Sequence, residues 1–192
     1  MYKYVIGGIL LLVAGAFATY KITAQKTPSE KIEPKGKILI AYYSYSGNTK
    51  KVAETIRDET SGDLFAVTAE GTYPENRKDM VQQAKEEIAK NYRPKLTAKI
   101  DDISQYDVVF IGSPNWWGTV TPQISSFLET YDLNGKMVIP FITHGGGGVQ
   151  NTVSDLTAQC KGCKVSDAPW IGYKNRTMGL ASWLKSLGLA KK

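Results

Sequence analysis

An apolar run that leads through a hydroxyl-rich loop into a helix constrains this chain more than any other feature. The run from Lys37 to Tyr43 is almost continuously apolar, which is typical of a strand covered on both faces of a parallel sheet. The loop behind it supplies side-chain donors and a flexible backbone through Ser44, Ser46, Gly47, Asn48 and Thr49. Because the next helix points its first free N–H groups at the same place, the loop is suited to holding a phosphate.

This loop differs from the phosphate loops of ATP- and GTP-binding proteins. Those loops carry a lysine in a G-x-x-x-x-G-K-[ST] pattern, and no lysine or arginine lies between Ser44 and Thr49. A phosphate would therefore be held by neutral donors and by the helix end, which argues against a nucleoside triphosphate as the ligand.

Apolar segments alternate with amphipathic segments along the rest of the chain, the pattern of an α/β fold. Further strands are expected at 63–68, 107–112, 137–143 and 165–171. Helices are expected from Asn48, at 74–91, from Pro122 behind the N-cap Thr121, around 149–156, and up to Gly188. With right-handed crossovers, five such units make an open, doubly wound parallel sheet.

Two details of this pattern test the assignment of elements. Pro140 falls inside the fourth strand, where its missing N–H predicts a bulge or an unpaired neighbour. The last helix is expected to bury Ala181, Leu184 and Leu187 before a glycine ends it.

Three loops follow the first, third and fourth strands of the predicted sheet, at 44–49, 113–119 and 144–148. In doubly wound sheets the ligand binds at this carboxyl edge, where the strand order reverses. The second loop places the rings of Trp116 and Trp117 at a rim, and the third is nearly all glycine, so that backbone N–H groups can approach something flat. Together the loops suit a planar aromatic ring carried on a phosphate.

With these loops the chain resembles the flavodoxin family over essentially all of 37–189, and in particular a bacterial flavodoxin-like subfamily. The resemblance implies a flavodoxin-like five-stranded parallel sheet of order 2-1-3-4-5 in three αβα layers, with FMN as cofactor. It places the FMN phosphate on Ser44, Ser46, Gly47, Asn48 and Thr49, and it counts Tyr45 of the same loop among the cofactor-binding residues. It places the isoalloxazine ring at the other two loops, on Pro114, Asn115, Trp116, Trp117, Gly118, Thr143, His144, Gly145 and Gly146. One tryptophan is expected to lie against the ring, and the other to pack at the rim. The Gly118 peptide is expected to be able to change its hydrogen bond to the flavin.

His144 is the one histidine of the chain, and two roles are open for it. It could act as a catalytic group that protonates reduced flavin or a bound quinone near neutral pH. The alternative, which we favour, is a loop histidine that only hydrogen-bonds the backbone.

Cys160 and Cys163 invite a redox interpretation, but their position argues against direct exchange with a flavin. They fall between the fourth helix and the fifth strand, at the edge of the sheet opposite the three loops. A local disulfide is expected if the domain is exported. Two cysteines without further ligands nearby do not make a zinc site, and no metal site is predicted.

The N-terminus reads as a separate part of the chain. Residues 1–22 contain an uncharged apolar run of the length of a signal peptide or single membrane anchor, and 23–36 reads as a linker before a domain at 37–192. We therefore expect an extracytoplasmic protein, secreted or attached to the membrane through this segment if it is uncleaved. Lys and Arg number 24 against 18 Asp and Glu, but five of these bases and two of these acids precede Lys37, so the domain keeps only a mild excess that fits a mixed solvated surface.

Two functions of different classes follow from the resemblance. The first is a non-enzymatic electron carrier that cycles FMN with a redox partner protein; the alternative is an FMN-dependent oxidoreductase that takes hydride from NAD(P)H and reduces a quinone. We favour the carrier, because NAD(P)H is scarce outside the cytoplasm. A scaffold of the same fold without flavin is a third possibility.

Other users of this fold, and a nucleic-acid partner, are not supported. Receiver domains need acidic residues after the first strand, and low-molecular-weight phosphatases need a cysteine and an arginine in the phosphate loop. No nucleic-acid-binding motif is present.

Overall fold

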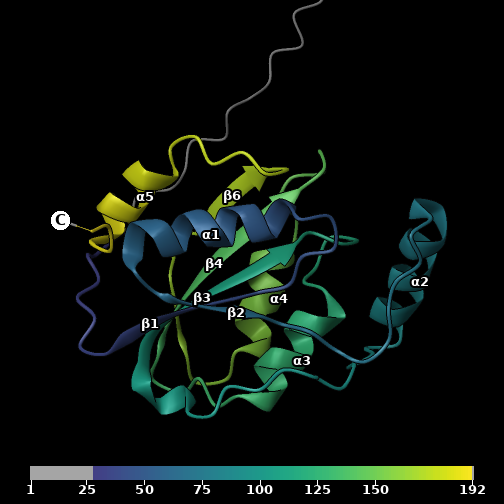
Figure 1. Cartoon of the computed structure of the whole chain (residues 1–192), viewed down its shortest axis with the longest axis horizontal. Coiled ribbons are helices and arrows are strands. Elements are labelled where there is room, and N and C mark those ends of the chain that lie inside the picture. The colour runs from purple at the N-terminus through teal and green to yellow at the C-terminus, as the bar shows by residue number, and fades with distance from the viewer. Residues whose placement is uncertain (1–27, 192) are drawn as a thin grey trace, which may run out of the picture.

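The computed structural model of this chain describes residues 28–191, in which a parallel sheet is covered by helices (Figure 1). The strands are β1 (Lys37–Tyr42), β2 (Asp63–Ala66), β3 (Tyr106–Pro114), β4 (Met137–His144), β5 (Lys164–Val165) and β6 (Trp170–Tyr173). The helices are α1 (Asn48–Thr60), α2 (Arg77–Ala89), α3 (Pro122–Thr130), α4 (Thr152–Gln159) and α5 (Leu180–Leu187), with a short 3₁₀ turn at Ile103–Gln105.

The sheet has the predicted doubly wound topology. Its order is β2-β1-β3-β4-β5, β6 also pairs with β4, and every pair is parallel. Successive residues of β1 face opposite sides, so that Ile40 packs with α1 and α5 and Leu39 packs with α3 and α4. The α/β class, the order 2-1-3-4-5 and the three layers are therefore confirmed.

The strand predicted at 165–171 was wrong as a single element, because it is split into β5 and β6. Pro140 faces this break. The carbonyls of Val138 and His144 accept hydrogen bonds from Ser166 and Lys174, and alternate residues of a strand point the same way. The missing N–H of Pro140 therefore points between β5 and β6, where no partner strand needs it, while the β3–β4 register runs without a shift.

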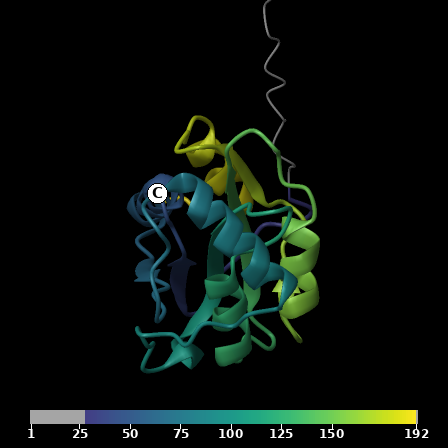
Figure 2. The ribbon, with the colours of Figure 1, turned by 90° about the vertical axis from the view of Figure 1, so that its right-hand side faces the viewer.

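Helix α2 does not lie flat on the sheet. Figure 1 shows it set apart on the side toward which β3 points, and Figure 2, which looks at that side, shows it lying across the front of the molecule. The segment 68–97, which leaves the sheet and carries α2, is called the excursion below. Its two ends are joined where Glu70 N–H donates to Lys95 O (2.8 Å) and Thr97 N–H donates to Thr68 O (2.9 Å). Of its own residues, α2 buries Met80 and Ala84. Because most of the stability of a helix in a protein comes from tertiary packing, the position of α2 depends on the few side-chain contacts that join it to the rest of the domain.

The two ends of the domain depart from the predictions in smaller ways. Ala181 is exposed, and Trp183 takes the core position beside Leu184 instead. Gly188 ends α5 in the left-handed conformation, as predicted. Within the predicted linker, Ile32 packs on the core and its N–H donates to Leu187 O (2.8 Å). The domain boundaries themselves stay a prediction.

The predicted signal peptide or anchor at 1–22 lies outside the described residues. Within 28–191, no helix combines the length and the hydropathy that crossing a membrane requires.

Candidate functional site

The three loops at the carboxyl ends of β1, β3 and β4 come together, as the sequence predicted. The hydroxyls of Thr49 and Thr143 share a buried hydrogen bond of 2.9 Å, which joins the start of α1 to the end of β4. Asn115 joins the other two loops, because its N–H donates to Thr143 O (2.7 Å) and its Nδ2 donates to Gly148 O (2.6 Å). The loops therefore form one surface.

The loop after β1 offers an open set of donors. Ser44 Oγ is buried and has no hydrogen-bond partner within residues 28–191. Gly47 precedes α1 with a φ of +81°, caps the helix without a side chain, and has open space where a Cβ would stand. The first N–H groups of a helix have no acceptor inside it, so they remain available here. Asn48 Nδ2 donates to Ser46 Oγ (2.9 Å), which shapes the loop.

Trp116 and Trp117 point in different directions. The Trp116 ring is half-buried and meets three tyrosine rings edge-on: Tyr73 at 5.0 Å, Tyr43 at 5.7 Å and Tyr45 at 6.1 Å. Trp117 is 55% exposed; its Nε1 donates to Val81 O of α2 (3.2 Å), and the Lys85 ammonium lies 5.1 Å from the centre of its ring. Trp116 belongs to the wall of the site, and Trp117 fastens α2 to it.

The turn at 116–119 is tightly held. Trp116 and Thr119 exchange backbone hydrogen bonds of 3.1 and 3.0 Å around positive φ angles at Trp117 and Gly118. Gly118 N–H donates to Asn115 Oδ1 (2.9 Å), and Gly118 O accepts from Asn151 N–H (3.0 Å). Any change of hydrogen bonding at the Gly118 peptide therefore has to break an existing bond first.

His144 shapes the glycine loop. Its Nδ1 accepts hydrogen bonds from the N–H groups of Gly146 (3.1 Å) and Gly148 (3.2 Å). Burial lowers the pKa of His144, so that the neutral ring with its proton on Nε2 is favoured. A Cβ added at Gly145 or Gly146 would meet nothing within 4 Å, which leaves room above the loop. The geometry matches the backbone-binding role, and a catalytic role for His144 stays a prediction.

Tyr73 was not predicted as a site residue, and it organises the wall around Trp116. Its hydroxyl donates to the Glu87 carboxylate of α2 and accepts from Gln123 Nε2 of α3 (3.3 Å). Burial, together with the neighbouring Glu87, raises the pKa values of Tyr43 and Tyr73, so both remain neutral phenols. No sequence signal marked Tyr73, because it lies in an irregular segment that only the fold brings beside Trp116.

Cys160 and Cys163 lie far from this surface. Cys163 directly precedes β5, whose Lys164 pairs with Met137 at the amino end of β4. The two Cα atoms are 5.8 Å apart and the sulfur atoms are joined, a separation that a disulfide spans. The oxidised state in the native compartment stays a prediction.

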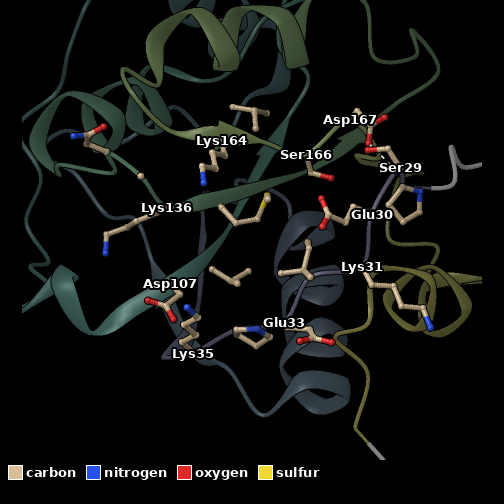
Figure 3. A pocket seen from close by; sticks show the side chains of 18 residues that line it. Ser29, Glu30, Lys31, Glu33, Lys35, Asp107, Lys136, Lys164, Ser166 and Asp167 are labelled. Carbon is tan, nitrogen blue, oxygen red and sulfur yellow. Dashed lines mark hydrogen bonds between the residues drawn. The ribbon is translucent and has the colours of Figure 1, made fainter.

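Elsewhere in residues 28–191, neither a metal centre nor the cavity at the opposite end of the sheet competes with this site. No group of three or more His, Cys, Asp or Glu within 28–191 is placed to hold a metal ion. A cavity of about 720 Å³ lies at the opposite end of the sheet, between residues 28–35 and the starts of β3, β4 and β5 (Figure 3). Its charged side chains, among them Lys136, Asp107 and Lys164, are of both signs, so it has no clear preference for a ligand charge.

Comparisons with known proteins agree with the geometry. The family model described as Flavodoxin matches residues 37–187. A flavoprotein from Lactobacillus acidophilus, solved in complex with FMN, is 28% identical over 77% of this chain and 98% of its own, with a TM-score of 0.63. A presumed flavoprotein from Bacteroides eggerthii is 31% identical over 80% of this chain and 98% of its own, with a TM-score of 0.69.

A curated relative carries the name of an enzyme. The NAD(P)H dehydrogenase (quinone) of Paraburkholderia phymatum is 29% identical over 126 residues, which are 57% of this chain and 59% of that protein. The chain thus spans less than two thirds of the length of this relative.

Proposed function

The chain belongs to the flavodoxin family, and we propose on that basis that it binds FMN at the three loops and passes electrons to or from a redox partner. The observation that carries the proposal is the buried, unpartnered hydroxyl of Ser44 beside the free N-terminus of α1. A buried hydroxyl without a partner costs free energy, about 1–3 kcal/mol, which a bound phosphate oxygen would recover.

The residues present fit FMN. Ser44, Ser46, Asn48, Thr49 and the N–H groups at the start of α1 would hold the phosphate. The open glycines of the loop at 145–148 would receive the ring edge, and Trp116 would line its side. The bound flavin would supply one- and two-electron transfer.

The chain's own residues have positioning roles in this proposal. Asn115 ties the turn at 116–119 to the glycine loop, and His144 orients the N–H groups of that loop by accepting two of them. The tyrosines around Trp116 fix its ring and exclude water from that side of the site.

Two activities fit this site, and we favour the electron carrier. The alternative is an FMN-dependent oxidoreductase that transfers electrons from NAD(P)H to a quinone, and the name of the curated relatives favours it. In either case the partner is a redox protein or a quinone.

The visible absorption spectrum of the full chain, purified after mixing with FMN, tests the proposal. We expect a retained flavin spectrum. Stepwise anaerobic reduction in one-electron steps would support the carrier, and rapid bleaching by NAD(P)H in a two-electron step would support the oxidoreductase. Flavin that is lost on gel filtration would remove the basis of both.

We further propose an extracytoplasmic location, with the domain secreted or held at the membrane. The apolar run within residues 1–22 supports it. Fractionation of cells that express the full chain, followed by N-terminal sequencing of the mature protein, tests the location and the cleavage together. A full-length protein in the cytosolic fraction would contradict it.

A further inference from the structure

A second cavity adjoins the wall of the candidate flavin site. It has a volume of about 350 Å³ and lies between the excursion that carries α2 and the start of α3. It shares Tyr73 with the flavin site, since the Tyr73 ring also meets the Trp116 ring edge-on, with the ring centres 5.0 Å apart. The volume is within the range of pockets that hold small organic ligands.

A buried acceptor without a partner lies at this cavity. Gln123, on the first turn of α3, is 6% exposed and lines the cavity. Its Nε2 donates to the Tyr73 hydroxyl, but its Oε1 accepts from nothing within residues 28–191. Such an acceptor is costly, and an N–H donor on a ligand bound in the cavity would satisfy it.

The charge of the lining points to a particular kind of ligand. Glu70, Glu86 and Glu87 contribute carboxylates, against the single ammonium of Lys90. Glu70 already pairs with Lys95 (2.6 Å), so the free negative charge comes mainly from the two carboxylates of α2. Those two accept from Gln82, Gln83 and Tyr73 and present further lone pairs, because a carboxylate accepts about four hydrogen bonds.

Aromatic rings complete the site. Tyr73 and Tyr92 line the cavity, and Tyr92 is 47% exposed, so its ring is accessible. Tyrosine rings attract cations through their faces. A lining of carboxylates, an unpartnered carbonyl oxygen and tyrosine rings is complementary to a positively charged group with N–H donors, and it repels phosphate.

We propose that this cavity is a binding site for a small organic cation that carries N–H groups, such as a primary amine. Gln123 Oε1 and Glu87 accept its hydrogen bonds, and the tyrosines contact its charge. The ligand would contact Tyr73, whose ring also packs against Trp116. Its binding would therefore change the surroundings of Trp116 in the wall of the flavin site. The site does not depend on FMN, whose phosphate has the opposite charge.

Calorimetric titration of the full chain with 1,4-diaminobutane tests this site, in the presence and absence of FMN. We expect binding in both states. Tetramethylammonium, which lacks N–H groups, and 1-butanol, which lacks the charge, should bind at least about tenfold more weakly, since a hydrogen bond to a charged group is worth that much. Equal affinity for the three compounds, or no binding of the diamine, would overturn the proposal.

Three variants locate the binding. Gln123→Met keeps the length of the side chain but removes the acceptor, and should weaken diamine binding by about tenfold. Gln123→Glu keeps an acceptor and adds charge, and should strengthen it, which separates a lost contact from a misfolded pocket. Glu129→Gln removes an exposed carboxylate outside this cavity and should leave the affinity unchanged. A decrease with Glu129→Gln equal to that with Gln123→Met would show a nonspecific charge effect and contradict the site.

Discussion

At the scale of single residues, the site rests on groups that the fold buries without satisfying. Ser44 Oγ, in the loop after β1, and Gln123 Oε1, in a side chain that lines the cavity beside α2, are two buried polar atoms without partners within residues 28–191. The sequence identified Ser44, because it follows a strand and precedes a helix. Gln123 lies in the first turn of α3, and nothing in the sequence around it marks a binding residue. It lines a cavity only because the excursion packs beside this helix.

Ser44→Ala should separate binding from stability. We expect the affinity for FMN to fall by about tenfold, through loss of one hydrogen bond to a charged oxygen, while the stability of the flavin-free protein stays equal or rises slightly. Fluorescence titration with FMN and urea unfolding measure the two quantities.

Ser126 provides the matched control, since its Oγ is also buried and unpartnered but lies on α3, away from the phosphate loop. Ser126→Ala should leave FMN affinity unchanged. Similar losses of affinity in both variants would contradict the assignment of Ser44.

His144 gives the glycine loop a pH dependence. Its folded pKa is lowered, so protonation favours the unfolded chain, where the group has its ordinary pKa of about 6.5. Its contribution to stability is therefore complete above that value and is lost as the pH falls through the lower, folded pKa. The stability of the wild type relative to His144→Gln should decrease from pH 7.5 to pH 5, as measured by urea unfolding. A difference independent of pH would show that His144 does not titrate in this range.

At the scale of elements, α2 is a helix of 13 residues that buries only two of its own side chains, Met80 and Ala84. Its attachment depends on Trp117 Nε1 to Val81 O and on the Tyr73 hydroxyl to Glu87. Periodicity located the helix at 74–91, and the structure places it at Arg77–Ala89. Its position at the carboxyl edge was not predicted, because helical periodicity says which face is apolar and not where in the fold that face is buried.

Tyr73→Phe should loosen this excursion without unfolding the domain. Loss of the hydrogen bond to Glu87 costs about 1–2 kcal/mol, so amide exchange over α2 should accelerate by roughly tenfold while exchange in β3 stays unchanged. Hydrogen exchange read by mass spectrometry measures both segments. The control is Tyr92→Phe, at a half-exposed ring, which should have no such effect. An equal acceleration in β3 would indicate global destabilisation instead.

At the scale of the whole molecule, the core and the binding edge use glycine in opposite ways. A Cβ at Gly112, in the middle of the sheet, would lie 2.1 Å from Phe141 Cζ, whereas one at Gly145 would meet nothing within 4 Å. The first glycine makes room for a neighbouring ring, and the second leaves room for a ligand. The amino edge of the same sheet carries Cys163 and the cavity of Figure 3, so the two edges are chemically distinct.

Gly112→Ala and Gly145→Ala should therefore have opposite effects. We expect the first to destabilise the domain by about 1–3 kcal/mol or more through overpacking, and the second to leave stability nearly unchanged while weakening FMN binding. Urea unfolding and FMN titration of both variants check this. Normal FMN affinity in Gly145→Ala would remove that loop from the site.

The strand order was implied by the resemblance to the flavodoxin family, whereas the sequence by itself determined the parallel sheet and the edge at which three loops meet. These follow from local patterns: buried runs of apolar residues, helix caps, and the chirality of crossovers. The fold of the loop from Ser44 to Thr49 was readable for the same reason, since its strand, turn and helix are contiguous.

Only the tertiary structure decided how the remaining parts come together. The last predicted strand is split opposite Pro140, and Trp183 occupies the core position that was expected for Ala181. Helix α2 lies across the carboxyl edge, and Tyr73 and Gln123 meet at one cavity. Each depends on contacts between residues far apart in the chain, whose energies are set by packing and shape. Local propensity and periodicity carry no information about such pairs, and this is why they could not be predicted.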